Sequence, residues 1–179
     1  MLTKREKSLL IDLVRHAVMV AIEGGGKDMD IPEDALTDAL WEKKGVFLAI
    51  YTGNSLRGCI GSVLGVLPLW QACMEYAHGA AIKDIRFSPI KRDELASLSY
   101  EITIAGPAHI LDDPSKLRPG RDGLILKKGF RQEAFLPGSL AELVKDPQSI
   151  FDHLKTKAGI DSEDESSEVW EVFEAEVFS

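Results

Sequence analysis

The sequence contains only two cysteines, Cys59 and Cys73. Two cysteines are too few for a disulfide scaffold, so reduced thiols in a reducing compartment are the simplest interpretation. The first residues lead into an amphipathic helix and lack the apolar core and cleavage site of a signal peptide. We therefore expect a cytoplasmic protein.

Long apolar runs and an excess of basic residues are also lacking. No run reaches the roughly 18 apolar residues that a membrane-spanning helix needs. The chain has 21 Lys and Arg against 29 Asp and Glu, a net charge of −8. Binding to a phosphate backbone depends on clustered Lys and Arg, and three basic residues near a turn (Lys127, Lys128 and Arg131) are typical of a solvated loop. We expect neither nucleic acid nor membrane as a partner, which leaves an unidentified small molecule or protein.

Sequence motifs for metals and cofactors are missing as well. There is no Cys-x-x-Cys, no pair of histidines at helical spacing and no carboxylate cluster with ligand spacing. The run Gly24-Gly25-Gly26 follows a predicted helix instead of opening one, so it does not fit a phosphate-binding loop. We expect no metal and no cofactor.

The composition that is present belongs to an ordinary folded domain. The 179 residues are 45% hydrophobic and 28% charged, which suits one domain over residues 1–179 with one well-developed core. Thr3 and Glu6 have the spacing of a capping box, and apolar residues at helical spacing follow them. Gly24 is a typical helix terminator.

Several other elements follow from periodicity and turn residues. Val46–Tyr51 and residues 56–61, joined by Gly53-Asn54, predict a β-hairpin. The remaining predicted elements are helix 68–83, strand 98–104, a loop at 112–122, a hairpin of 124–126 with 133–136, a helix capped by Asp146, an acidic loop at 161–168, strand 169–178 and a possible short helix at 34–40. Strands that alternate with helices but are joined by hairpins predict an α+β fold, with an antiparallel or mixed sheet and flanking helices.

The strand from Leu56 to Gly61 is unusual. Period-two alternation places Arg57, Cys59 and Gly61 on one face and Gly58 on the other. Glycines weaken a strand, and they often mark a bulge or a close approach of another chain or a ligand to the backbone. This segment is therefore the expected functional surface, with Arg57, Gly58 and Gly61 as candidate binding residues.

Two chemical interpretations of this surface are open. Arg57 could lower the pKa of the Cys59 thiol and make it a nucleophile or redox group, or Arg57 could bind an anion in a cleft. The alternative for Cys59 is a small buried side chain, which is a common fate of free cysteine.

Three further residues are candidates for the same site. Asp84 and Arg86 follow the second predicted helix; Asp84 could orient either arginine through a bidentate pair, or both residues could be ordinary surface groups. Glu101 lies on the polar face of the third strand, where it could act as a general base or as a solvent-facing residue.

Several segments together resemble a known family, in order and over nearly the whole chain. The Leu-Arg-Gly-Cys-Ile-Gly hexapeptide at 56–61 is the most specific, and the others lie at 45–48, 84–87, 100–102, 118–123, 135–137, 151–154 and 157–159. They resemble the AMMECR family, named for the Alport syndrome, mental retardation, midface hypoplasia and elliptocytosis chromosomal region. Two positions depart from the family pattern: Ile85 replaces a proline, and Gly138-Ser139 replace Gln-Val.

The resemblance implies an α+β fold with a larger and a smaller subdomain and a cleft between them. It implies no established reaction. Prokaryotic members are found beside Memo-type and radical S-adenosylmethionine proteins, which hints at a shared pathway. Two hypotheses follow: a non-catalytic adaptor or ligand-binding module that uses a cleft around residues 56–61, or a cleft enzyme in which Cys59 reacts and Glu101 or Asp84 moves protons.

Overall fold

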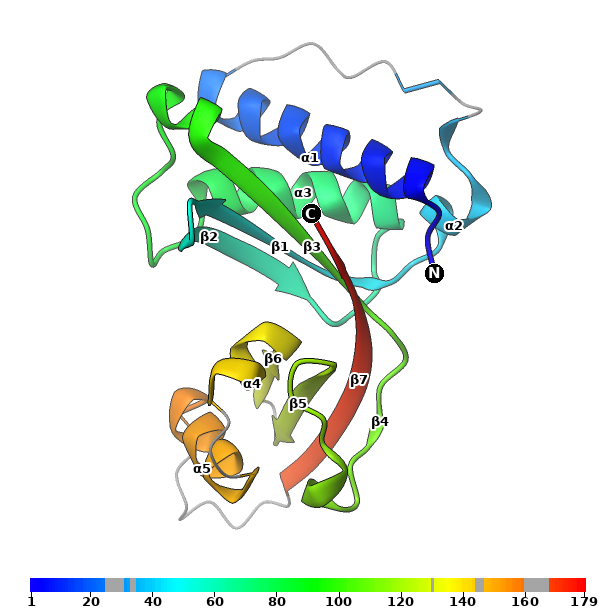
Figure 1. The fold of residues 1–179 in the computed structure, drawn as a ribbon, viewed down its shortest axis with the longest axis vertical. Coiled ribbons are helices and arrows are strands. Elements are labelled where there is room, and N and C mark those ends of the chain that lie inside the picture. The colour runs from blue at the N-terminus through cyan, green and yellow to red at the C-terminus, as the bar shows by residue number, and fades with distance from the viewer. Residues whose placement is uncertain (25–30, 33–34, 130, 144–146, 160–167) are drawn as a thin grey trace. The chain divides into compact units, whose positions relative to one another are not determined.

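The computed structural model describes residues 1–24, 31–32, 35–129, 131–143, 147–159 and 168–179. The chain divides into two compact units (Figure 1). Unit 1 comprises Met1–Ile104 and Glu176–Ser179, and unit 2 comprises Ala105–Ala175. Helices combine with a mostly antiparallel sheet, so the predicted α+β class, with a larger and a smaller part, is confirmed.

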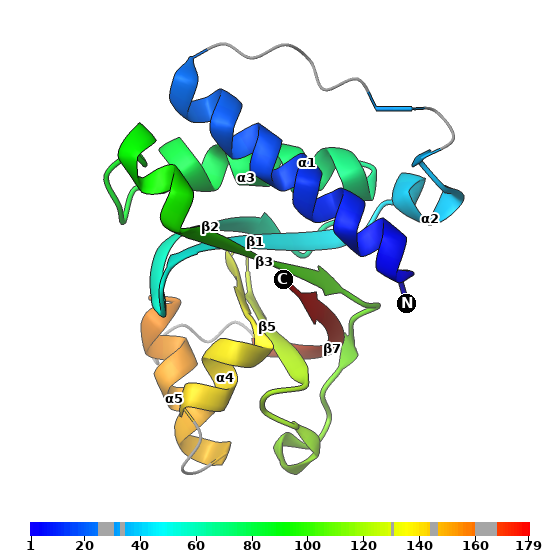
Figure 2. The ribbon, with the colours of Figure 1, turned by 45° about the horizontal axis from the view of Figure 1, so that its top comes forward.

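Unit 1 places two long helices over one face of a small sheet. Its elements are α1 (Lys4–Glu23), α2 (Asp38–Trp41), β1 (Gly45–Thr52), β2 (Ser55–Ser62), α3 (Leu69–Ile82), the 3₁₀ helix η2 (Arg92–Ser97) and β3 (Leu98–Ala105). Figure 2 shows α1 and α3 side by side above these strands. Leucines of α1, small residues of α3 and aliphatic residues of β1 and β3 form the core between the layers.

The first helix begins as its sequence predicts. The Thr3 hydroxyl accepts the backbone N–H of Glu6, and the Glu6 carboxylate accepts the backbone N–H of Thr3 at 2.7 Å. Glu6 also accepts the hydroxyl of Thr37, so one carboxylate ties the helix start to the segment before α2. Gly24 ends the helix with φ 72°, a left-handed conformation that glycine adopts without steric cost.

The β1–β2 hairpin carries the residues that the sequence singles out. Within unit 1 the strand order is β2-β1-β3, which makes β2 an edge strand. The antiparallel register pairs Ala49 with Cys59 and Ile50 with Gly58, but the next pair is Tyr51 with Leu56. Arg57 is therefore the extra residue of a β-bulge, and the strict period-two alternation expected for this strand fails at that residue.

Unit 2 is built on a second group of antiparallel strands. Its elements are β4 (His109–Ile110), the 3₁₀ helix η3 (Pro114–Lys116), β5 (Asp122–Lys128), β6 (Arg131–Phe135), α4 (Pro137–Leu143), α5 (Pro147–Lys157) and most of β7 (Glu168–Phe178). The strand order here is β7-β5-β6, and β4 pairs with β7. Aliphatic residues of β5 and α5 and the ring of Phe135 form a separate core.

Most of the predicted elements are confirmed, and the exceptions are short. Both hairpins, the second helix and the strands beginning near residues 98 and 169 lie where the sequence places them. The prediction missed α4 and β4, because a seven-residue helix that starts with Pro-Gly and a two-residue strand show too little periodicity. The helix expected at 34–40 is present only as Asp38–Trp41. The capping role of Asp146 lies outside the described residues, as does the acidic loop predicted at 161–168 except for Glu168, which instead begins β7.

Gly58 sets how closely α3 packs on β2. A Cβ atom at Gly58 would overlap the backbone carbonyl oxygen of Ala80 in α3, so either the helix or the strand would have to move. Figure 2 shows α3 directly over the hairpin. The missing side chain therefore brings the end of α3 close to the edge strand.

We expect the substitution Gly58→Ala to destabilise the protein, because overpacking of this kind costs about 1–3 kcal/mol or more. Gly138→Ala is the matched control. Nothing lies within 4 Å of the added Cβ at Gly138, which sits in α4. Alanine favours a helix over glycine by about 0.5–1 kcal/mol, so this control should keep or raise stability. Urea denaturation followed by circular dichroism measures both variants; equal midpoints would contradict the tight packing of α3 on Gly58.

Candidate functional site

The outer edge of β2 is closed at Cys59 by two side chains. The Asp84 carboxylate accepts the Cys59 backbone N–H at 2.8 Å, and the Arg86 guanidinium donates to the Cys59 carbonyl oxygen at 3.0 Å. Along an antiparallel strand, the backbone N–H and C=O groups of successive residues alternate between bonding the neighbouring strand and pointing away from it. The N–H and C=O of Cys59 point away from β1. Asp84 and Arg86 thus supply the donor and acceptor that another strand would provide.

Asp84 and Arg86 also bind each other in a bidentate pair. Arg86 Nε donates to Asp84 Oδ1 at 2.9 Å, and Arg86 Nη2 donates to Oδ2 at 2.7 Å. The Asp84 side chain is 5% exposed, whereas that of Arg86 is 55% exposed. The bidentate pair that the sequence suggested for Asp84 is present, with Arg86 as the partner.

The charge of Asp84 is fixed by this arrangement. Its hydrogen bonds to Arg86, together with the N–H of Cys59, lower the pKa of Asp84 to about 2 against the opposing effect of burial. The same pair raises the pKa of Arg86. At neutral pH the pair is therefore fully ionised, and its acidic member lies beneath its basic member.

The Cys59 thiol is half-buried beside this pair. Burial raises the pKa of the thiol, Arg86 opposes that shift, and the charges of Asp84 and Glu101 reinforce it. The expectation that Arg57 lowers the pKa of Cys59 is wrong for two reasons. The cation that acts on the thiol is Arg86, and burial outweighs it.

Arg57 is occupied by a different partner. Its Nε and Nη2 donate to the two carboxylate oxygens of Glu94 at 2.7 and 3.0 Å, and Nη1 donates to the carbonyl oxygen of Ser88 at 2.7 Å. The Arg57 side chain is only 16% exposed. Arg57 therefore fastens β2 to η2 and to the segment before it, and an anion would have to compete with Glu94 for Arg57.

Both candidate glycines lie against this chain's own backbone. Gly58 faces the Ala80 carbonyl, and a Cβ atom at Gly61 would overlap the Cα atom of Phe47 and the carbonyl oxygen of Val46 in β1. The close backbone approach expected from the sequence is present. Its causes are α3 and β1, so neither glycine needs a ligand to explain it.

Glu101 lies half-buried in β3, close enough for its charge to affect the Cys59 thiol. The structure thus gathers Cys59, Asp84 and Arg86 by direct contact and Glu101 by electrostatic proximity, while Arg57 pairs with Glu94. Sequence reasoning missed Glu94, because no spacing rule links two residues that are 37 positions apart.

The part of the chain that the structure describes has no metal-binding cluster and no membrane-spanning helix, and its second cysteine is buried. No group of three or more His, Cys, Asp or Glu residues there could hold a metal ion. None of its helices is both long enough and apolar enough to cross a membrane. Cys73 is buried in the core of unit 1, and burial raises the pKa of its thiol to about 12.

Comparisons with known proteins agree with the resemblance in the sequence. The AMMECR1 family model matches residues 11–178. A protein of Thermococcus onnurineus is 35% identical over 182 residues, covering 94% of this chain and 87% of that protein. A protein of Aquifex aeolicus is 36% identical over 179 residues, with 94% and 90% covered.

A solved structure extends this likeness to the fold. The crystal structure of the uncharacterised protein PH0010 from Pyrococcus horikoshii matches with a TM-score of 0.81 and 32% identity, covering 94% of this chain and 88% of that one. The family model, the relatives and the fold all span nearly the whole length of the sequence. This chain belongs to the AMMECR1 family.

Proposed function

We propose that this chain is a non-catalytic binding module, an adaptor or ligand-binding protein that recognises its partner through the surface around residues 56–61. The observation that carries the proposal is Arg86, a guanidinium held rigidly beside Cys59 and yet 55% exposed. A cation that is fixed in one orientation loses little conformational entropy when it binds, which favours recognition.

The geometry of Arg86 leaves one edge of the guanidinium available. Asp84 occupies Nε and Nη2, and Cys59 accepts a second bond from Nη2. The guanidinium also interacts with the Cys59 thiol, but among the described residues Nη1 donates to no oxygen atom. The ring of Phe87 lies 5.5 Å from the guanidinium carbon. An incoming carboxylate or phosphate oxygen would find its donor at Nη1.

The residue between Asp84 and Arg86 adds an apolar contact. Ile85 is 100% exposed, although it stands between two side chains that are fixed to β2. A partner group with an anionic end and an apolar neighbour, such as the carboxyl end of a peptide, fits this pairing. Because Asp84 already neutralises Arg86, we expect weak and reversible binding, as suits an adaptor.

The enzymatic alternative makes a different demand on Cys59. A nucleophilic or redox cysteine must be accessible and must ionise near neutral pH. Burial raises the pKa of Cys59, and the adjacent cation is paired with Asp84. These two facts favour the binding module over a reaction at Cys59 with Glu101 or Asp84 as proton carriers. The two unpaired thiols, Cys59 and Cys73, also suit the cytoplasmic location that we infer for the protein.

The reactivity of Cys59 separates these two functions. We expect its alkylation by iodoacetamide to be slow at neutral pH and to keep rising above about pH 8.5, where an ordinary thiol is half ionised. Mass spectrometry of the peptide that contains Cys59 measures the rate at each pH, and Cys73 in the same sample provides a buried reference. A rate that levels off near pH 7 would overturn the non-catalytic assignment.

Binding at Arg86 is testable with two matched probes. N-acetyl-leucine carries a carboxylate beside an apolar side chain, and N-acetyl-leucinamide lacks only the charge. We expect the acid, and not the amide, to shift the backbone NMR signals of Cys59, Ile85 and Arg86 in the ¹⁵N-labelled protein. Loss of a charge-assisted hydrogen bond in Arg86→Gln should weaken binding about tenfold.

Arg92→Gln is the control for this experiment, because Arg92 lies in the same unit and its side chain is 82% exposed. It removes the same charge from a side chain that pairs with Glu23 and, within the described part of the chain, with no residue of the site. Unchanged signals of Gly58 and Ile60 show that Arg86→Gln keeps the hairpin intact. Equal binding of both probes, or undiminished binding by Arg86→Gln, would refute recognition through Arg86.

A further inference from the structure

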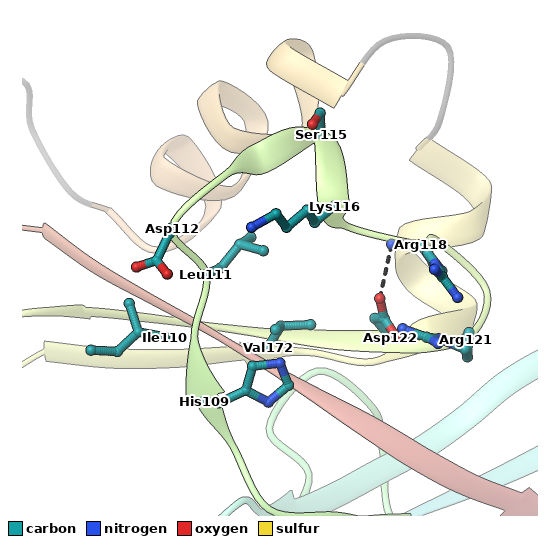
Figure 3. Close-up of a pocket in the computed structure, with 10 residues that line it drawn as sticks. All are labelled: His109, Ile110, Leu111, Asp112, Ser115, Lys116, Arg118, Arg121, Asp122 and Val172. Carbon is teal, nitrogen blue, oxygen red and sulfur yellow. Dashed lines mark hydrogen bonds and ion pairs between the residues drawn. The ribbon is translucent and has the colours of Figure 1, made fainter.

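Unit 2 contains a pocket of about 580 Å³ that the sequence analysis does not predict. The segment from β4 through η3 to the start of β5 curves around it, and Val172 of β7 contributes to its wall (Figure 3). This volume lies within the range of sites that hold small organic molecules. All of the lining residues belong to unit 2, whereas residues 56–61 belong to unit 1.

Basic side chains line the pocket. Lys116 and Arg118 are exposed, and neither side chain has an ion pair or hydrogen bond among the described residues. Figure 3 shows Lys116 extending across the upper side of the pocket, with His109 below it and Arg118 at one end. Asp112 also lines the pocket, and the charge of Lys116 acts on nearby Asp113. Lys116 and Arg118 nevertheless form no ion pair among the described residues, so their charges can attract an anion to this concavity.

A tight turn fixes the position of Arg118. The backbone N–H of Arg121 donates to the carbonyl of Arg118 at 3.1 Å, and between them lie Pro119 and Gly120, whose φ is 89°. Proline followed by a glycine with positive φ is the pattern of a type II turn. Pro119 and Gly120 therefore form this turn without backbone strain.

Asp122 locks this turn from inside the protein. It is 1% exposed, and its carboxylate accepts the backbone N–H of Arg118 at 2.9 Å and the Nε of Arg121 at 2.6 Å. Arg121 also pairs with Glu174 at 3.1 Å. The charge of Arg121 is therefore compensated, whereas Arg118 keeps its guanidinium for another partner.

The rest of the pocket is partly apolar. Ile110 is 63% exposed, Leu111 is half-buried, and Val172 is buried in the wall. Figure 3 places Ile110 and Leu111 toward the end of the pocket opposite Arg118. The site thus has the Arg118 guanidinium at one end and aliphatic surface at the other, where the Asp112 carboxylate and the amino end of Lys116 also lie.

From these features we infer that unit 2 carries a second binding site, for a small molecule that combines an oxyanion group, phosphate or carboxylate, with an apolar portion. Arg118 contacts the oxyanion, the flexible side chain of Lys116 supplies a second positive charge, and Ile110 and Leu111 contact the apolar portion. Arginine recognises planar and tetrahedral oxyanions through paired N–H donors, and lysine adds a mobile point charge. Asp122 acts as a positioning residue that holds the turn.

Titration of the full ¹⁵N-labelled chain with pyrophosphate and, separately, citrate tests this site. We expect saturable shifts of the His109, Leu111, Lys116 and Arg118 backbone signals with at least one of these anions. The anion that binds more tightly assigns the oxyanion as phosphate or carboxylate. The variant with both Lys116→Gln and Arg118→Gln should bind at least about tenfold more weakly, since each lost charge-assisted hydrogen bond costs that order of affinity.

The matched control replaces Arg15 and Arg92 by glutamine, which removes the same net charge from two exposed side chains of unit 1. Full binding by this control together with weak binding by the pocket variant supports the site. Equal weakening in the two variants would mean that only general charge attracts the anions. That result, or the absence of shifts between residues 109 and 122, overturns the inference. Should the double variant fold poorly, the single variants Lys116→Gln and Arg118→Gln provide the same comparison.

Discussion

The backbone of Cys59 must find hydrogen-bond partners at the edge of a sheet, and the rest of the candidate site depends on how it does so. Asp84 accepts its N–H and Arg86 donates to its carbonyl. An unpaired edge strand invites pairing with other chains, and covering it with a charged pair removes that hazard. The same arrangement fixes the position of Arg86, whose side chain remains 55% exposed. It also places the charges of Asp84 and Arg86 beside the Cys59 thiol.

Glycine makes this closure possible. Because Gly58 has no side chain, the carbonyl of Ala80 near the end of α3 can approach β2 closely. α3 ends at Ile82, so Asp84 follows two residues later, at the right point to reach the neighbouring residue, Cys59. The hexapeptide at 56–61 is thus first of all a packing surface. Gly58 admits α3, the helix that precedes Asp84, and Gly61 admits β1.

The sequence predicts local structure well because local rules govern it. The capping box of Thr3 and Glu6, the turns of both hairpins and the helix after Pro68 each depend on residues within a few positions of one another. The bidentate Asp84–Arg86 pair was also within reach, since its members are two residues apart.

The features that the sequence did not predict depend on contacts between distant segments. The bulge at Arg57 and its pairing with Glu94 arise from the meeting of β2 and η2, which no periodicity encodes. The burial that raises the pKa of Cys59 depends on everything that surrounds the thiol. The pocket of unit 2 likewise needs β4, a turn and β7 to come together, and residues 112–122 alone predict only a loop.

Amide hydrogen exchange at Cys59 tests the central claim most directly. Gly61 lies two residues further along β2, and its N–H points to the same open edge without a partner among the described residues. The N–H of Ile60 bonds to β1 and serves as the internal reference. The account predicts that Cys59 exchanges at least about tenfold more slowly than Gly61, and that Asp84→Ala abolishes this difference while Ile60 stays protected. Equally fast exchange at Cys59 and Gly61 in the unaltered protein, or protection of Cys59 that survives Asp84→Ala, would contradict it.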